Sequence, residues 1–142
     1  LYLSEALLAT GEASRALQQA DKALAQARGT GSVKYQAKAL ALRGQILLEA
    51  GQRDEASREL AAALALARRI GYPTLTWQAA HVLARAQAAT GDIDGAARSA
   101  RLALETMEQI AARVPDSGLR RAFLSWRRGE TAREDADRLL RG

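Results

Sequence analysis

The chain has 142 residues, of which 48% are apolar and 4% aromatic, and its formal net charge is +5. It contains no cysteine, which excludes disulfides and thiolate metal sites, and no run of about 18 apolar residues, the length that a membrane-spanning helix needs. With so few aromatic residues the interior must be built mainly from alanine and leucine, which favours closely packed helices over a β-sandwich. We therefore expect an all-α fold.

Apolar spacing and turn residues predict six helices before the C-terminal region. They are expected at about 1–10, 13–28, 33–50, 54–70, 75–90 and 94–113. Ser32 and Thr74 are suited to cap the third and fifth helices, because a hydroxyl oxygen can accept a hydrogen bond from an open N–H group. Pro115 is expected to stop the sixth. Since the pattern is already helical at Leu1, we expect a fragment of a longer protein.

One short pattern occurs three times at a constant interval, in Gly11–Ala16, Gly51–Ala56 and Gly91–Ala96. Each glycine is expected to end a helix in a left-handed conformation, which costs glycine nothing sterically. The oxygen-bearing residue three positions later is expected to cap the next helix, at Ser14, Asp54 and Asp94. A fixed period of this length predicts stacked helix–turn–helix repeats.

The pattern resembles the tetratricopeptide repeat family, whose 34-residue unit has a turn glycine, an alanine five positions later and another seven further on. The residues that carry the resemblance are Gly11 and Ala16, then Gly51, Ala56 and Ala63, then Gly91, Ala96 and Ala103. Gly44 and Ala84 match the small residue of the first helix of each repeat. Leu40 and Ala80 replace the aromatic residue usual in that family. The repeat here is longer than the family's unit and looks like those of large bacterial signalling proteins, so the resemblance implies a cytoplasmic location and a right-handed superhelix.

The repeats are expected to span residues 1–28, 33–70 and 75–113, followed by a capping helix and tail at 114–142. Ser117 can cap a short helix in which Leu119 and Trp126 share an apolar face with Ala122 and Phe123. Such an atypical end piece suits the cap of a repeat array, and a partner-binding or dimer-forming helix is the alternative. Thr131–Glu134 is a capping-box sequence, which predicts a last helix to about Leu140.

We find no pattern that predicts catalysis, a cofactor or a metal site. His81 is the only histidine, which rules out a His-rich metal site and a His–Cys pair, and we expect it to be a polar, partly exposed residue. Asp92 and Asp94 could suggest an acid pair, but the column shared with Ser14 and Asp54 favours capping for Asp94. The glycines near Gly29 lack the Gly-Lys-Ser/Thr of a phosphate-binding loop. We expect the protein not to be an enzyme.

Four arginines surround the expected C-terminal helix with Phe123 and Trp126: Arg120, Arg121, Arg127 and Arg128. Arginines on phosphates with an aromatic for stacking would suit nucleic acid. However, both aromatic residues lie on the apolar face, and arginine is spread over the whole chain. A nucleic-acid-binding accessory domain therefore stays the second alternative, and nucleic acid is not the expected partner.

The resemblance implies that the first helix of each repeat lines a concave groove for a peptide or helix of a partner. Carried over by position, the groove residues are Tyr2, Glu5, Lys38, Leu42, Gln45, Glu49, Gln78, His81, Val82 and Arg85. We therefore expect a protein-interaction or regulatory scaffold module of a larger signalling protein, whose partner is a protein, a peptide or another domain of the same chain. The first alternative is a sensor of a small ligand or peptide. Self-association stays a further alternative, because a fragment of a repeat array exposes apolar surface where its upstream repeats would pack.

Overall fold

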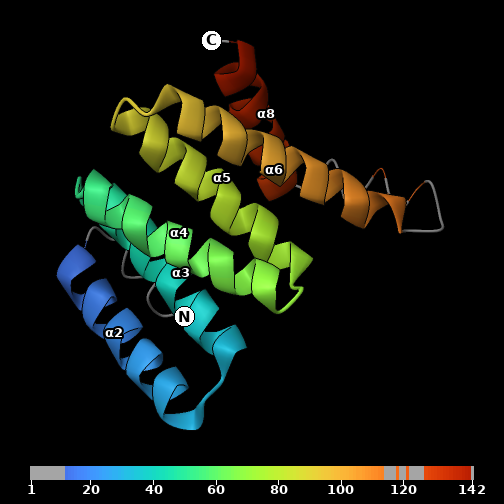
Figure 1. Ribbon diagram of the computed structural model, residues 1–142. Helices are drawn as coiled ribbons and strands as arrows, with labels where there is room; N and C mark the ends of the chain where they lie inside the picture. Colours follow the sequence, from blue (N-terminus) through green and yellow to red (C-terminus); the bar gives the residue numbers. More distant parts are fainter. Residues whose placement is uncertain (1–11, 114–117, 119–120, 122–126, 142) are drawn as a thin grey trace. The chain divides into compact units, whose positions relative to one another are not determined.

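The computed structural model describes residues 12–113, 118, 121 and 127–141. All of the elements in these stretches are α-helices, which confirms the all-α prediction. The helices, shown in Figure 1, are α2 (Ala13–Thr30), α3 (Val33–Glu49), α4 (Arg53–Arg69), α5 (Pro73–Ala89), α6 (Ile93–Ala112) and α8 (Arg127–Arg141). The helix expected at 1–10 and the apolar face expected at Leu119–Trp126 lie outside the described residues.

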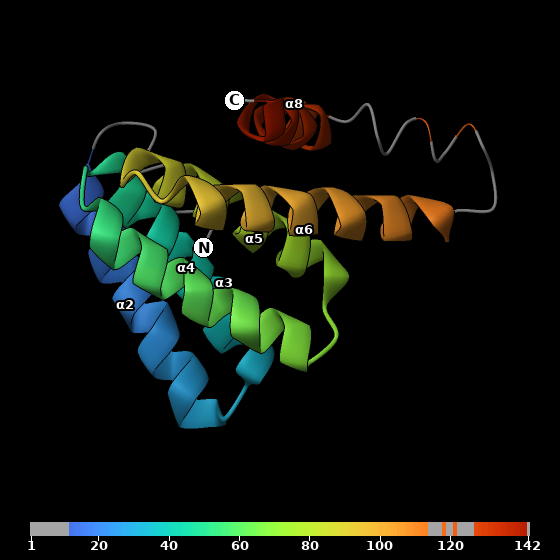
Figure 2. The ribbon, with the colours of Figure 1, turned by 45° about the horizontal axis from the view of Figure 1, so that its top comes forward.

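The chain divides into two compact units, which we call unit 1 (Leu1–Gly71) and unit 2 (Tyr72–Gly142). The division falls in the turn between the second and third expected repeats. In unit 1, α3 packs against both α2 and α4. In unit 2, α5 packs against α6, and α8 packs on α6 and, less extensively, on α5. Figures 1 and 2 show α8 crossing α6.

The turns between α2 and α6 are all short and all contain a glycine in the left-handed region. The four glycines, evenly spaced along the chain, are Gly31, Gly51, Gly71 and Gly91, with φ between 66° and 87°. After α3, for example, the Gln52 amide donates to the Leu47 carbonyl at 2.9 Å, and after α5 the Asp92 amide donates to the Gln87 carbonyl at the same distance. These are the bonds of a Schellman motif. The predicted C-caps Gly51 and Gly91 are confirmed, and Gly11 lies outside the described residues.

The predicted N-caps in the repeated pattern are wrong. The helices α2, α4 and α6 begin at Ala13, Arg53 and Ile93, one residue earlier than the expected cap. Ser14, Asp54 and Asp94 therefore lie inside the first helical turn. Two of the true N-cap residues, Glu12 and Gln52, make no side-chain cap bond, whereas Asp92 accepts a hydrogen bond from the Gly95 amide at 3.0 Å. Asp54 and Asp94 still favour their helices, because a carboxylate in the first turn interacts with the helix dipole.

Three other predicted helix starts have different outcomes. Ser32 caps α3 as expected, since its hydroxyl oxygen accepts from the Tyr35 amide at 3.3 Å. Thr74 does not cap α5, because Pro73 already occupies the first helical position, where its missing N–H costs nothing. The capping box at Thr131–Glu134 is also wrong, because α8 is already helical from Arg127 and Thr131 lies inside it.

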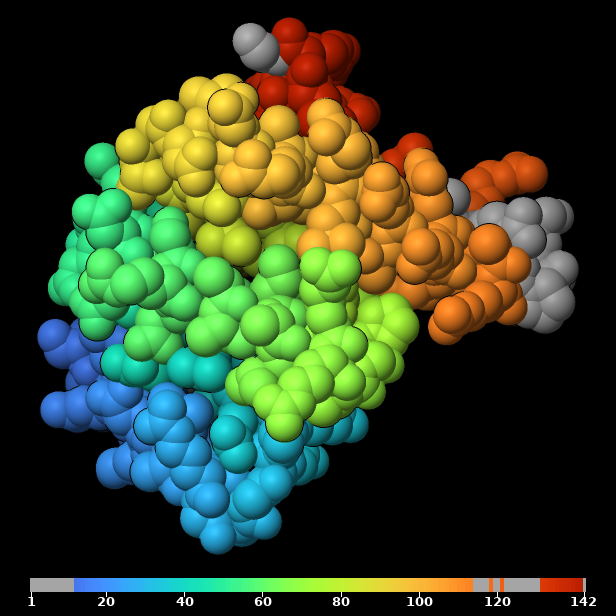
Figure 3. Space-filling model, in the orientation of Figure 1, coloured from blue at the N-terminus to red at the C-terminus, as the bar shows by residue number. Residues whose placement is uncertain are grey.

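Alanine and leucine form the core of both units, as the composition predicts. In unit 1, Ala16 and Ala20 of α2 pack against Leu42 and Ile46 of α3. The alanines of the repeated pattern, Ala16, Ala56 and Ala96, are fully buried, so the small side chain lets neighbouring helices approach closely. Unit 2 adds larger buried side chains, Trp77 and Met107. Figure 3 shows the outer sides of α4 in green and α6 in orange.

Candidate functional site

The expected groove residues of unit 1 lie on α3, and Tyr2 and Glu5 lie outside the described residues. Lys38 is half-buried, with its ammonium 5.6 Å from the centre of the Tyr35 ring, a cation–π distance. Gln45 is half-buried and Glu49 exposed. Leu42 is only 6% exposed and packs in the core against Ala16 and Ala20 of α2. Packing within unit 1 therefore accounts for Leu42, and the accessible part of this face is polar.

The expected groove residues of unit 2 lie on α5. Gln78 and Val82 are half-buried and Arg85 is exposed. His81, one turn before Arg85, contacts the C-terminal helix: its Nε2 lies 2.8 Å from Oδ2 of Asp135 on α8. Because an ionised carboxylate can only accept, Nε2 carries the proton of this hydrogen bond. A residue assigned to the groove is thus bonded to another helix of the same chain.

Asp135 is the centre of a small polar cluster. Its other carboxylate oxygen, Oδ1, pairs with Arg138 one turn later on α8. The side chains of His81 and Asp135 are 14% and 18% exposed, whereas that of Arg138 is 73% exposed. The bond between His81 and Asp135 is therefore largely shielded from water, and Arg138 closes the cluster on its outer side.

Small apolar residues surround this cluster. Ala132 and Ala136 of α8 are buried, at 1% and 2% exposure. Ala136 packs with Ala84 of α5 and Ala100 of α6, and the partly buried Leu104 and Leu139 pack against this group. We call Ala132, Asp135, Ala136 and Leu139 the α8 interface. Their spacing of three, one and three residues places them on one face of the helix.

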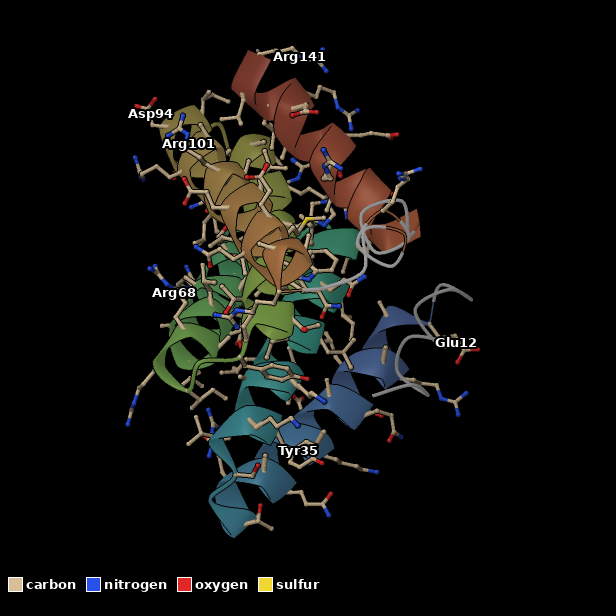
Figure 4. The ribbon with its side chains drawn as sticks, turned by 90° about the vertical axis from the view of Figure 1, so that its right-hand side faces the viewer. Glu12, Tyr35, Arg68, Asp94, Arg101 and Arg141 are labelled. Carbon is tan, nitrogen blue, oxygen red and sulfur yellow. The ribbon has the colours of Figure 1, made fainter. Side chains whose placement is uncertain are left out.

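The opposite side of α6 is charged. Asp94 and Arg101 lie on the side of α6 away from α8 in Figure 4, which also labels Arg141 at the end of α8. Both are exposed, as is Arg98 between them. Unit 2 therefore has one helix-packed side, with the α8 interface, and one solvated side.

Unit 1 has its own polar link, which the sequence analysis missed. Arg43 of α3 donates from Nη1 to Oε1 of Glu59 on α4 at 2.7 Å, and its Nε lies 2.7 Å from Oδ1 of Asp21 on α2. The second contact is an ion pair without the alignment of a hydrogen bond. Arg43 thus joins the three described helices of unit 1, α2, α3 and α4. An arginine between the apolar residues Leu42 and Ile46 was the signal in the sequence.

The described residues also contain a pocket in unit 1, where α2 ends and α3 begins. Its volume is about 320 Å³, and it is lined by Ala23, Gln26, Ala27, Thr30 and Tyr35. The floor is apolar, and Gln26 and Thr30 supply polar groups. The Thr30 hydroxyl donates to the Ala27 carbonyl, so its oxygen can still accept a hydrogen bond from a ligand.

The remaining candidates from the sequence are Asp92 and the C-terminal group of arginines and aromatic residues. Asp92 caps α6, and within the described stretches no group of three potential metal ligands occurs. Of the four C-terminal arginines, Arg121 is exposed, Arg120 lies outside the described residues, and Arg127 and Arg128 belong to the first turn of α8. Phe123 and Trp126 also lie outside the described residues, so the proposed aromatic–arginine surface stays a prediction.

No protein-family model matches the chain, and a comparison with curated proteins finds no match. Among the described helices, none has the length and apolar character that crossing a membrane requires.

Proposed function

We propose that the chain is a protein-interaction module that binds a helix or peptide of a partner on the faces of α3 and α5 that carry the expected groove residues. The proposal includes the finer architecture, a right-handed tetratricopeptide-like superhelix, and a role as a regulatory scaffold inside a larger bacterial signalling protein of the cytoplasm. The regular hairpins and the even spacing of the four turn glycines support the repeat architecture. Repeats of this kind present long helical faces to partners.

The observation that supports the interaction function most is the packing of α8 on α5 and α6. A helix that carries mostly charged and polar side chains is held there by two buried alanines and the bond between Asp135 and His81. The same side of α5 carries the expected groove residue His81. Unit 2 therefore has a face whose small residues and buried polar contact at His81 are suited to a helix.

The test is affinity capture from nuclease-treated lysate with the intact chain and with two single variants, Gln45→Glu and Val82→Glu. Both residues are half-buried on the proposed faces, so a carboxylate there should weaken partner binding by about tenfold or more, as the loss of an interface anchor does. Leu42 is left unchanged because its substitution would damage the core.

Gln18→Glu and Ala62→Glu are matched controls, because they place the same charge on α2 and α4. Ala62 and Gln18 are both exposed, and neither belongs to the proposed faces. A protein retained by the intact chain and the controls, but lost with the face variants, supports the proposal. Equal retention by all five chains, with unchanged helicity by circular dichroism, contradicts it.

The pocket beside Tyr35 favours a second candidate, a small-ligand sensor. Its volume of about 320 Å³ lies at the lower end of small-molecule sites, and it combines apolar walls with a few polar groups. A ligand that binds only the folded state raises the unfolding temperature. Ala23→Leu, which fills the pocket, should abolish the increase, whereas Ala25→Leu on the exposed side of α2 should not. A compound library that produces no increase with the intact chain rules out this candidate for the compounds tested.

A further inference from the structure

The contact of α8 differs from the other helix contacts of unit 2 in the size of its side chains. The α5–α6 hairpin contains Trp77, Leu83 and Met107, all buried to 5% exposure or less. Among the side chains described in α8, those of residues 131–141, the ones buried to that extent are Ala132 and Ala136, and the two leucines are only partly covered, with Leu140 37% exposed. Because apolar burial supplies most of the free energy of helix packing, α8 is held less strongly than α5 and α6 hold each other.

The hydrogen bond between His81 and Asp135 gives this weak contact its specificity. The two side chains are each less than one-fifth exposed, so a helix without an acceptor at this position would leave His81 without its partner. An unpaired polar group in such surroundings is costly, whereas a carboxylate restores a short bond of 2.8 Å. The small neighbours Ala84 and Ala100 admit only a small side chain at the next position. The site thus selects both a carboxylate and a small residue.

We propose that α8 is an internal competitor that covers a helix-binding face of unit 2, formed by His81, Ala84, Ala100 and Leu104. The partner is a helix that repeats the α8 interface: a small residue, an acidic residue three positions later, a small residue next to it, and a leucine three further on. This proposal rests on the interaction function and names both the partner's chemistry and its regulation. Since α8 is tethered to the same chain, a partner helix must bind more tightly than α8 or arrive when α8 has been released.

The first experiment measures binding of a fluorescein-labelled peptide of residues 127–141 to the full chain by fluorescence anisotropy. The intact chain should bind this probe weakly, because its own α8 occupies the face. Asp135→Ala in the chain removes the anchor of the tethered helix while leaving His81 available to the probe. We expect the probe to bind at least about tenfold more tightly to this variant, since the tethered competitor is weakened.

Asp137→Ala is the matched control, because Asp137 is exposed on the same helix and the substitution is chemically identical. It should bind the probe like the intact chain. A second chain variant, His81→Ala with Asp135→Ala, should lose the tenfold gain, because the probe's own aspartate then has no donor. Equal affinity of the Asp135→Ala and Asp137→Ala chains overturns the proposal and makes α8 a fixed structural helix.

If Asp135→Ala fails to fold, hydrogen exchange of the intact chain tests the α8 proposal instead. Amides of α8 should exchange at least about tenfold faster than those in the middle of α5 and α6, because α8 leaves by a local opening and not by global unfolding. Equal exchange in the three helices overturns the proposal. Partner capture that depends on Gln45 and Val82 would still stand after that result, so a failure of the α8 proposal is distinguishable from a failure of the interaction function.

Discussion

The α3–α4 pair of unit 1 and the α5–α6 pair of unit 2 belong to successive repeats, yet they fill the same crossing with different side chains. In unit 1, Gly44 faces Leu60 so closely that an added Cβ would lie 2.4 Å from the leucine Cγ. In unit 2 the corresponding residues are Ala84 and Ala100, both 1% exposed. Both pairs therefore keep the same space between their helices. Unit 1 fills it with a glycine and a leucine, and unit 2 fills it with two alanines.

The polar links of the two pairs differ in the same way. Arg43 and Glu59 form the link in unit 1, and the corresponding positions in unit 2 hold Leu83 and Ser99. Ser99 instead donates to Oε1 of Gln87, one turn further along α5, at 2.7 Å. Each pair thus has a polar link between its helices, and the two links are built from different positions of the repeat. The comparison indicates that close approach is a property of the repeat, whereas the polar link belongs to each unit.

The strongest test of the comparison replaces the side chains at the crossing of α3 and α4 with those of unit 2. Leu60 is 1% exposed, so Leu60→Ala should lower the free energy of unfolding by about 2–5 kcal/mol through lost burial and a cavity. Combining it with Gly44→Ala recreates the alanine pair of unit 2. The double variant should be more stable than Leu60→Ala, because the new methyl group fills part of the cavity and alanine favours the helix by about 1 kcal/mol over glycine.

Urea denaturation of the four chains in this cycle gives the coupling free energy between positions 44 and 60. Gly44→Ala alone should be less favourable than in the double variant, since the intact leucine must move to admit the methyl group. If the changes in the free energy of unfolding simply add, the two positions do not share one space. The comparison of the crossings would then be incorrect.

A smaller effect is expected when the polar link of unit 1 is replaced by the residues at the corresponding positions of unit 2. Arg43→Leu introduces the residue of unit 2 but leaves the Glu59 carboxylate, only 17% exposed, without its donor. We expect a loss of about 1–3 kcal/mol in the free energy of unfolding. Arg43→Leu with Glu59→Ser, which recreates the Leu83 and Ser99 pair, should recover most of it. Asp21→Ala is the control, and it should cost well under about 1 kcal/mol because Asp21 is 57% exposed. A double variant no more stable than Arg43→Leu would contradict the explanation.

Much of the fold was predictable because its signals are local. Gly51 and Gly91 follow apolar helical segments, and glycine alone accepts the left-handed turn without strain, so the helix ends were expected correctly. The N-caps of the repeated pattern were not, since Ser14, Asp54 and Asp94 have the right chemistry for a cap but lie two positions after the true N-cap residues. Only the hydrogen bonds of the Schellman turn reveal that the helix begins immediately after it.

The candidate site was less predictable because it depends on contacts between distant segments. His81 was singled out by its position on the first helix of a repeat, but its partner Asp135 is 54 residues away, and no local rule relates the two. Leu42 was assigned to an exposed face from the repeat pattern, and the structure places it in the core with Ile46. The α8 interface was not identified from the sequence, because nothing local specifies the surface that Ala132, Ala136 and Leu139 meet.

The smallest predicted effect concerns the first turns of α4 and α6. Asp92 caps α6 because Gly95 leaves room for its carboxylate: an added Cβ at Gly95 would lie 2.2 Å from Oδ2 of Asp92. Asp92→Ala should therefore lower the free energy of unfolding by about 1 kcal/mol in urea denaturation.

At the corresponding positions of unit 1, Gln52 makes no cap bond and Glu55 carries the Cβ that Gly95 lacks. Gln52→Asp should consequently gain less than about 0.5 kcal/mol, because the aspartate cannot take the side-chain position that Asp92 has. A gain near that of a full cap, about 1 kcal/mol, would show that the glycine is unnecessary for the cap, and Gly95→Ala would then be expected to leave α6 as stable as before.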